Sequence, residues 1–145
     1  MELNKLIIRP EYFSSGIADE HMRYLGEGQK VIPTDLFAEI ISFNNEYLEY
    51  ASMNIALKTV FWQEIYFLDQ KGYSLKERLE KSLRIPVVYY SEGLLKELPS
   101  KPEIDLYRHE TTRLMSLKKN WYLLLRSLLG KSNYGVYNNE VLDTQ

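Results

Sequence analysis

The stretch DLFAEIISFNNEYLEYASMNIALKTVFWQEIYFLDQK, from Asp35 to Lys71, contains neither glycine nor proline and decides our prediction of the fold. Pro33 keeps the preceding backbone extended and Thr34 can cap a first helical turn, whereas Gly72 offers a left-handed stop. The pattern therefore predicts one continuous helix over 35–71. At about 1.5 Å per residue, such a helix runs on the order of 55 Å, which exceeds the width of a compact domain of this size.

Apolar and aromatic side chains recur along this stretch in steps of three and four residues, which places them on one helix face. The main line is Leu36, Ile40, Phe43, Tyr47, Tyr50, Asn54, Leu57, Phe61, Glu64 and Leu68. A second apolar line runs beside it, so the stripe is too wide for one partner helix to cover. We expect burial from several sides, either by the rest of the chain or by other subunits.

Two short runs outside this stretch are rich in β-forming residues. One is LNKLIIR, from Leu3 to Arg9, and the other is VVYY, from Val87 to Tyr90. A lone strand would leave its backbone amides unsatisfied, and neither run has a convincing partner nearby. We therefore interpret the first as an extended arm or short helix and the second as an isolated segment.

The rest of the chain predicts helices around the long one. Ser14 and Gly26 bracket a brief helix, SLKE after Gly72 is a capping box, and SKPE opens a second long helix that Gly130 ends. The predicted segments are 1–34 (arm and short helix), 35–71 (long helix), 74–98 (short helices), 101–129 (second long helix) and 131–145 (tail). We predict a single all-α domain over 1–145, a helical bundle of two long antiparallel helices with several short helices and an extended N-terminal arm.

Composition excludes several classes of protein. The chain has no cysteine, so disulfides, thiolate metal sites and cysteine nucleophiles are ruled out. Its N-terminus lacks the apolar core of a secretory signal, and its longest apolar run near the C-terminus is far short of a bilayer span. We expect a soluble protein with no membrane contact, located in the cytoplasm or within a virion assembled there.

The charge is divided between two segments. Residues 35–71 carry a net charge of −4 and residues 101–131 carry +4, whereas the whole chain has −2. These opposite charges predict that the two segments are neighbours. Arg108, Lys119 and Arg126 form a basic face on the second predicted helix. An alternative function is therefore a small regulatory protein that contacts nucleic acid or an acidic protein through this face, although the acidic net charge disfavours nucleic acid.

One cluster could carry chemistry, namely Asp105, His109, Glu110 and Arg113 in DLYRHETTR. A zinc-binding helix of the HExxH type needs a second histidine where Arg113 stands, so no metal site is predicted. His109 oriented by Asp105 could act as a general acid or base, which makes an enzyme with a helix-borne His/Asp site the second alternative. Salt bridges along a solvated helix explain the same residues more simply. We predict no enzymatic activity and no cofactor.

These patterns favour a non-enzymatic structural or interaction subunit of a larger assembly, for instance a connector or adaptor of a virus or phage particle. Tyrosine and tryptophan tolerate half-wet positions and recur at protein interfaces. The residues that we expect to contact other subunits in a homo- or hetero-oligomer are Tyr47, Tyr50, Trp62, Tyr66, Phe67, Tyr134 and Tyr137.

Overall fold

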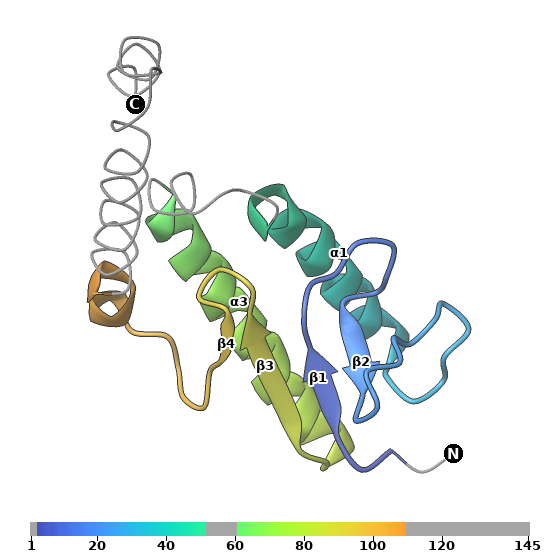
Figure 1. Cartoon of the computed structure of the whole chain (residues 1–145). Coiled ribbons are helices and arrows are strands. Elements are labelled where there is room, and N and C mark those ends of the chain that lie inside the picture. Colours follow the sequence, from blue (N-terminus) through green and yellow to red (C-terminus); the bar gives the residue numbers. More distant parts are fainter. Residues whose placement is uncertain (1–2, 52–60, 110–145) are drawn as a thin grey trace, which may run out of the picture.

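The computed structural model describes residues 3–51 and 61–109. Within these residues the chain has a mixed α/β fold, in which two helices lie on one side of a four-stranded sheet (Figure 1). The elements are β1 (Leu6–Ile8), β2 (Ile17–Asp19), α1 (Thr34–Ala51), α3 (Trp62–Leu83), β3 (Val87–Ser91) and β4 (Lys96–Glu97). The prediction of an all-α domain is therefore wrong, and so is the helical bundle.

The sheet joins segments that are far apart in the sequence. Its strand order is β2-β1-β3-β4; β1 is antiparallel to β2 and parallel to β3, and β3 is antiparallel to β4. Ile7 pairs with Ala18 on one side and with Val88 on the other. The run at 3–9 is thus not an arm or a helix but contains an interior strand, because β1 pairs on both sides. Its second partner, β3, follows both helices in the sequence.

The short elements predicted around the sheet also need correction. Residues 17–19, expected in a brief helix, form β2, and the VVYY segment is not isolated, because it forms most of β3. Short helices were predicted over 74–98, but α3 continues to Leu83 and β3 and β4 follow it. Burial alternates along β3, where Val87 and Tyr89 are buried and Val88 is half-buried, so one sheet face packs on the helices.

The two helices run antiparallel and pack side by side. Lys71 Nζ lies 2.8 Å from Glu46 Oε2, and Arg78 pairs with Glu39 at 2.5 Å, so residues further along α3 meet residues further back along α1. In one continuous helix, Glu46 and Lys71 would lie roughly 37 Å apart. The single helix predicted over 35–71 is therefore wrong. Residues 52–60, which connect α1 and α3, are outside the described residues.

Gly72 does not end a helix, as the sequence suggested, but lies inside α3. A Cβ atom built at this position would overlap the Tyr89 ring and lie 2.7 Å from Phe43 Cζ. The glycine therefore allows α3 to approach β3 and α1 closely. The helix ends instead at Leu83, where it is capped by Arg84, whose φ of 56° is left-handed and whose amide donates to the Glu80 carbonyl. The sequence SLKE lies within α3 and is not a helix start.

One hydrophobic core lies between the helix pair and the sheet. The predicted apolar line of α1 is confirmed as its buried face, since Ile40, Phe43 and Tyr47 have no exposed surface. The Phe43 ring lies 5.7 Å from the Tyr47 ring and 6.1 Å from the Tyr89 ring. Other buried members of the core are Leu6, Ile8, Ile17, Ile32, Leu36, Phe37, Ile65, Leu68, Tyr73, Leu75, Leu79, Val87, Leu98 and Tyr107.

After β4 the chain crosses to the side of α3 away from α1 and forms a helix over 104–109 (Figure 1). The second long helix was predicted over 101–129, and only its first part lies among the described residues. Tyr107 attaches this segment to the core, because its ring lies 5.1 Å from the ring of Tyr66 in α3. Residues 110–145, with the predicted tail, lie outside the described residues.

Candidate functional site

A carboxylate lies at the centre of the core. The side chain of Asp69, from α3, has no exposed surface and accepts hydrogen bonds from four hydroxyl groups. Tyr47 and Tyr89 donate to Oδ1 at 2.8 and 2.6 Å, and Ser91 and Tyr107 donate to Oδ2 at 2.7 and 2.5 Å. We call these five residues the Asp69 cluster. It connects α1, α3, β3 and the helix over 104–109 at one point.

Two backbone amides fix the direction of these hydrogen bonds. The amide of Gly93 donates to the Tyr47 hydroxyl oxygen at 2.8 Å, and the amide of Leu94 donates to Ser91 Oγ at 3.0 Å. Each of these two hydroxyls therefore accepts from the backbone and directs its own proton at Asp69. The turn after β3 thus aligns two donors toward the carboxylate.

Burial dominates the electrostatics of the cluster. It raises the pKa of the Asp69 carboxyl above its ordinary value, and the four hydroxyl donors oppose this shift. Burial and the nearby carboxylate together raise the pKa of Tyr47 and of Tyr89 well above that of a free phenol. The pKa of Tyr107 is raised for the same two reasons. The tyrosines therefore remain protonated donors at any physiological pH.

The Asp69 cluster is enclosed by the protein. Ser91 has no exposed surface and Tyr107 is 1% exposed, so a substrate in solution cannot reach the carboxylate in this conformation. Satisfied buried polar networks of this kind hold surrounding elements in one arrangement. We therefore assign the cluster a structural role, which is to fix the positions of the helices beneath the molecular surface.

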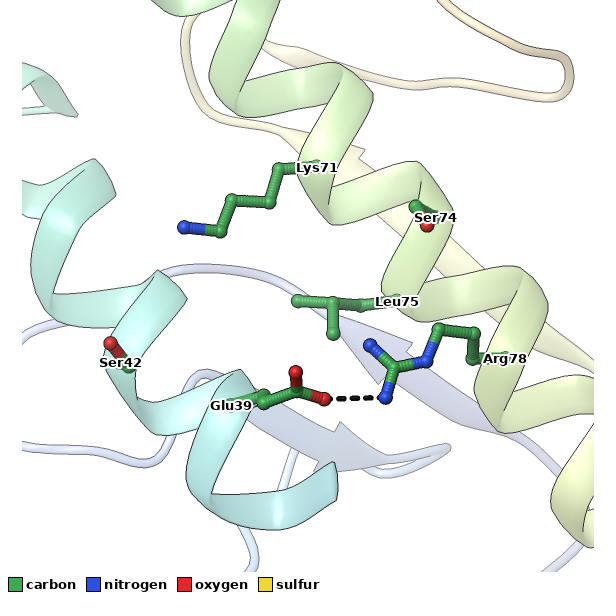
Figure 2. Close-up of a pocket in the computed structure, with 6 residues that line it drawn as sticks. All are labelled: Glu39, Ser42, Lys71, Ser74, Leu75 and Arg78. Atoms are coloured by element: carbon green, nitrogen blue, oxygen red, sulfur yellow. Dashed lines mark ion pairs between the residues drawn. The ribbon is translucent and has the colours of Figure 1, made fainter. Parts of the chain in front are cut away.

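The surface feature that these helices create is a groove along their outer side, away from the sheet. Figure 2 shows the end near Arg78, with side chains from α1 and α3 on opposite walls and the Glu39–Arg78 ion pair across it. We call the whole depression the α1–α3 groove. It is lined by Glu39, Ser42, Glu46, Glu49, Tyr50, Glu64, Phe67, Leu68, Lys71, Ser74, Leu75 and Arg78.

Phe67 is the most unusual residue of this groove. It is 63% exposed, although it belongs to a helix whose other large apolar side chains are buried or half-buried. Its ring lies 5.5 Å from the ring of Tyr66, which is half-buried and accepts a hydrogen bond from Gln70. On the facing wall, Tyr50 is also half-buried. The groove therefore presents an exposed aromatic ring beside partly covered ones.

The charges around Phe67 are mainly negative. Glu46, Glu49 and Glu64 line this end of the groove together with one base, Lys71. The Lys71 ammonium pairs with Glu46. Glu49 and Glu64 form no ion pair with any base among residues 3–51 and 61–109. The exposed ring is thus bordered by carboxylates that lack a cationic partner within this part of the chain.

The seven residues predicted to contact other subunits have different environments. Tyr47 is fully buried in the Asp69 cluster, whereas Tyr50, Trp62 and Tyr66 are half-buried and Phe67 is exposed. Tyr134 and Tyr137 lie outside the described residues.

The residues of the two alternative functions are only partly described. On the predicted basic face, Arg108 is exposed and lies 3.8 Å from Asp105, and Lys119 and Arg126 lie outside the described residues. Of the predicted His/Asp cluster, His109 is exposed on the helix over 104–109, while Glu110 and Arg113 lie outside. Both alternatives remain predictions.

Sequence reasoning missed the Asp69 cluster, since it counted Asp69 only in the net charge of residues 35–71. Helical spacing carried a signal, because Ile65, Gly72 and Tyr73 share its face and are all buried. The hydroxyl donors could not be identified in the same way, because Ser91 and Tyr107 belong to other elements.

Within the described ranges, no group of three or more His, Cys, Asp or Glu residues is placed to hold a metal ion. No helix in the same ranges is long and apolar enough to cross a membrane. A scan against protein-family models found no match for this chain, and neither a curated protein nor a solved structure matches it. The function must therefore be inferred from its own residues and geometry.

Proposed function

We propose that this protein is a non-enzymatic structural or interaction subunit of a larger protein assembly, and that it binds a partner through the α1–α3 groove. The observation that carries the proposal is the exposure of Phe67 within a groove bordered by carboxylates. Aromatic side chains at the centre and polar side chains at the rim are the usual arrangement of a protein interface.

The energetics of Phe67 support this role. Fully burying a phenylalanine side chain stabilises a protein or complex by about 1.5–3 kcal/mol. Because 63% of the residue remains exposed, most of this stabilisation is not realised within the chain. A partner that covers the ring would therefore gain on the order of 1–2 kcal/mol from this residue alone. Aromatic residues of this kind often dominate the binding energy of an interface.

The rigid position of the groove also supports binding. Both of its walls are held from behind by the Asp69 cluster, in which Tyr47 of α1 and Asp69 of α3 are directly hydrogen bonded at 2.8 Å. A surface that is already ordered loses little conformational entropy when a partner binds. The buried polar cluster and the exposed aromatic ring are thus two parts of one proposed interaction element.

Sedimentation of the native protein in a clarified extract of its source tests the proposal. A subunit of an assembly sediments faster than expected for a 17.2 kDa chain. Phe67→Ser should move much of the protein to the position of the free chain. Leu95→Ser is the matched control, because Leu95 is 61% exposed but lies outside the groove, and it should leave the profile unchanged. A wild-type protein that sediments only as a free chain would contradict the proposal.

A further inference from the structure

We infer that the occupant of the α1–α3 groove is the basic segment 110–131 of a second copy of this chain. This inference rests on the proposed function and names the partner. The groove is acidic near Phe67, and the segment 110–131 is basic. Glu49 and Glu64 flank Phe67 without a basic partner among the described residues, and residues 110–131 carry a net charge of +4.

The segment has the chemistry that the groove requires. Its bases are Arg113, Lys118, Lys119, Arg126 and Lys131, against the single acid Glu110. Its apolar residues include Leu114, Leu117 and Trp121, which recur at three- and four-residue steps. Such spacing predicts an amphipathic helix, and amphipathic helices commonly bind in grooves through their apolar face. Arg113 and Lys118 lie beside this face, so they would then lie near the carboxylates of the rim.

The predicted helix of the segment is long enough to fill the groove. Along α3, the groove extends from Glu64 to Arg78, which corresponds to roughly 21 Å of helix. A helix over 110–129, which Gly130 would end, would be roughly 30 Å long and would therefore cover the groove from end to end. The two ion pairs across the groove, Lys71–Glu46 and Arg78–Glu39, leave the end near Phe67 as its most acidic part.

The position at which the described chain ends favours a second copy over the same copy. The helix over 104–109 lies on the side of α3 away from α1, and Tyr107 attaches it there through Tyr66 and Asp69 (Figure 1). The groove lies on the opposite side of α3, between α3 and α1. The segment would have to cross over α3 to reach the groove of its own chain, whereas two copies can exchange segments reciprocally about a two-fold axis.

Sedimentation velocity of the purified full-length protein between 1 and 100 µM, roughly spanning the dissociation constants of modest protein interfaces, tests the inference. We expect reversible dimerisation that weakens as salt is raised, because the contact pairs opposite charges. Glu49→Lys combined with Glu64→Lys should raise the dissociation constant at least tenfold. Glu77→Lys is the matched control, since Glu77 is exposed on α3 outside the groove, and it should have no such effect.

Charge reversal of bases in the segment 110–131 is the decisive part of the experiment. Arg113→Glu with Lys118→Glu should weaken the dimer to a similar extent, because these two bases lie beside the apolar face, and combining these changes with Glu49→Lys and Glu64→Lys should restore it. Circular dichroism melting of each variant identifies any that fail to fold. A dimer that is unaffected by these reversals would overturn this inference and leave the proposed function intact. A protein that stays monomeric at every concentration would also overturn this inference, whether the segment binds to its own chain or to nothing. The proposed function would still be tested separately by sedimentation in the extract.

Discussion

The carboxylate of Asp69 and the hydroxyl of Tyr107 lie 2.5 Å apart in the core, and this contact ties the start of the C-terminal helical segment to α3. Tyr107→Phe removes one of four donors to the carboxylate and keeps the ring. Hydrogen bonds to charged groups typically contribute about 1.5–3 kcal/mol, so we expect the free energy of unfolding to fall by about that amount. Urea denaturation of the full-length protein measures it.

Tyr90→Phe is the control for this change. Tyr90 is half-buried in β3, and its ring packs under the Arg9 guanidinium at 4.2 Å, a contact that phenylalanine preserves in large part. We expect its effect to stay within about 0.5 kcal/mol, as for most changes of this kind away from buried networks. Equal losses in the two variants would show that the bond to Asp69 has no special importance.

The ionisation of Asp69 should make stability depend on pH. Burial raises the pKa of this carboxyl in the folded protein, so the folded state holds the proton more tightly than the unfolded state. The stability that this group contributes is fully present below about pH 4 and is lost as the pH rises through the raised pKa.

Asp69→Asn isolates this dependence, because both proteins share every other titrating group. Chemical denaturation from pH 4 to pH 8 should show the wild type losing stability relative to Asp69→Asn as the pH rises. A constant difference across the range would mean that Asp69 does not titrate with a raised pKa.

Gly72 should resist replacement despite its place inside a helix. In an open helix position, Gly→Ala stabilises by up to about 1 kcal/mol. Here a Cβ atom would overlap the Tyr89 ring, so we expect Gly72→Ala to destabilise by about 1–3 kcal/mol, as overpacked cores do. Gly28→Ala is the control, because a Cβ atom there meets nothing within 4 Å. Thermal melting compares the two, and a stabilised Gly72→Ala would contradict the close packing of α3 against β3.

Asn44 should hold the loop between β1 and β2. Its side chain is 1% exposed; its Oδ1 accepts from the Glu11 amide at 2.9 Å, and its Nδ2 donates to the carbonyls of Glu11 and Ser14 at 3.3 and 3.0 Å. Asn44→Ala leaves these backbone groups without partners, which costs about 1–3 kcal/mol. Hydrogen exchange of the Glu11 amide should accelerate at least tenfold, whereas the exposed neighbour Asn45→Ala should leave it unchanged. Slow exchange in both variants would refute the role of Asn44.

The sequence predicted the local features of this fold better than its long-range ones. The start of α1 after Pro33 and the burial of Ile40, Phe43 and Tyr47 were confirmed, because helix caps and helical periodicity are set by residues a few positions apart. The pairing of Ile7 with Val88 was missed, since each strand is short and its partner lies far along the chain. A short strand is identified by what pairs with it, and that partner is not visible in the local sequence.

Two errors arose where tertiary packing overrides local preference. Gly72 was read as a helix stop, because glycine is destabilising in an isolated helix, whereas here its lack of a side chain makes room for the Tyr89 ring. Asp69 entered only the net charge of residues 35–71, and its burial was not predicted, because burial of a carboxylate is costly unless several donors converge on it. Those donors come from three other elements, so their convergence follows only from the three-dimensional fold.

Site-specific photo-crosslinking tests most directly whether the α1–α3 groove binds a protein. Benzoylphenylalanine replaces Phe67 in one variant and Glu77, on the exposed face of α3 outside the groove, in the other. Each full-length variant is irradiated in a native extract, and its adducts are identified by mass spectrometry. Our account predicts a discrete protein adduct from position 67 and little or none from position 77. No adduct at position 67, or the same adducts at both positions, would contradict it.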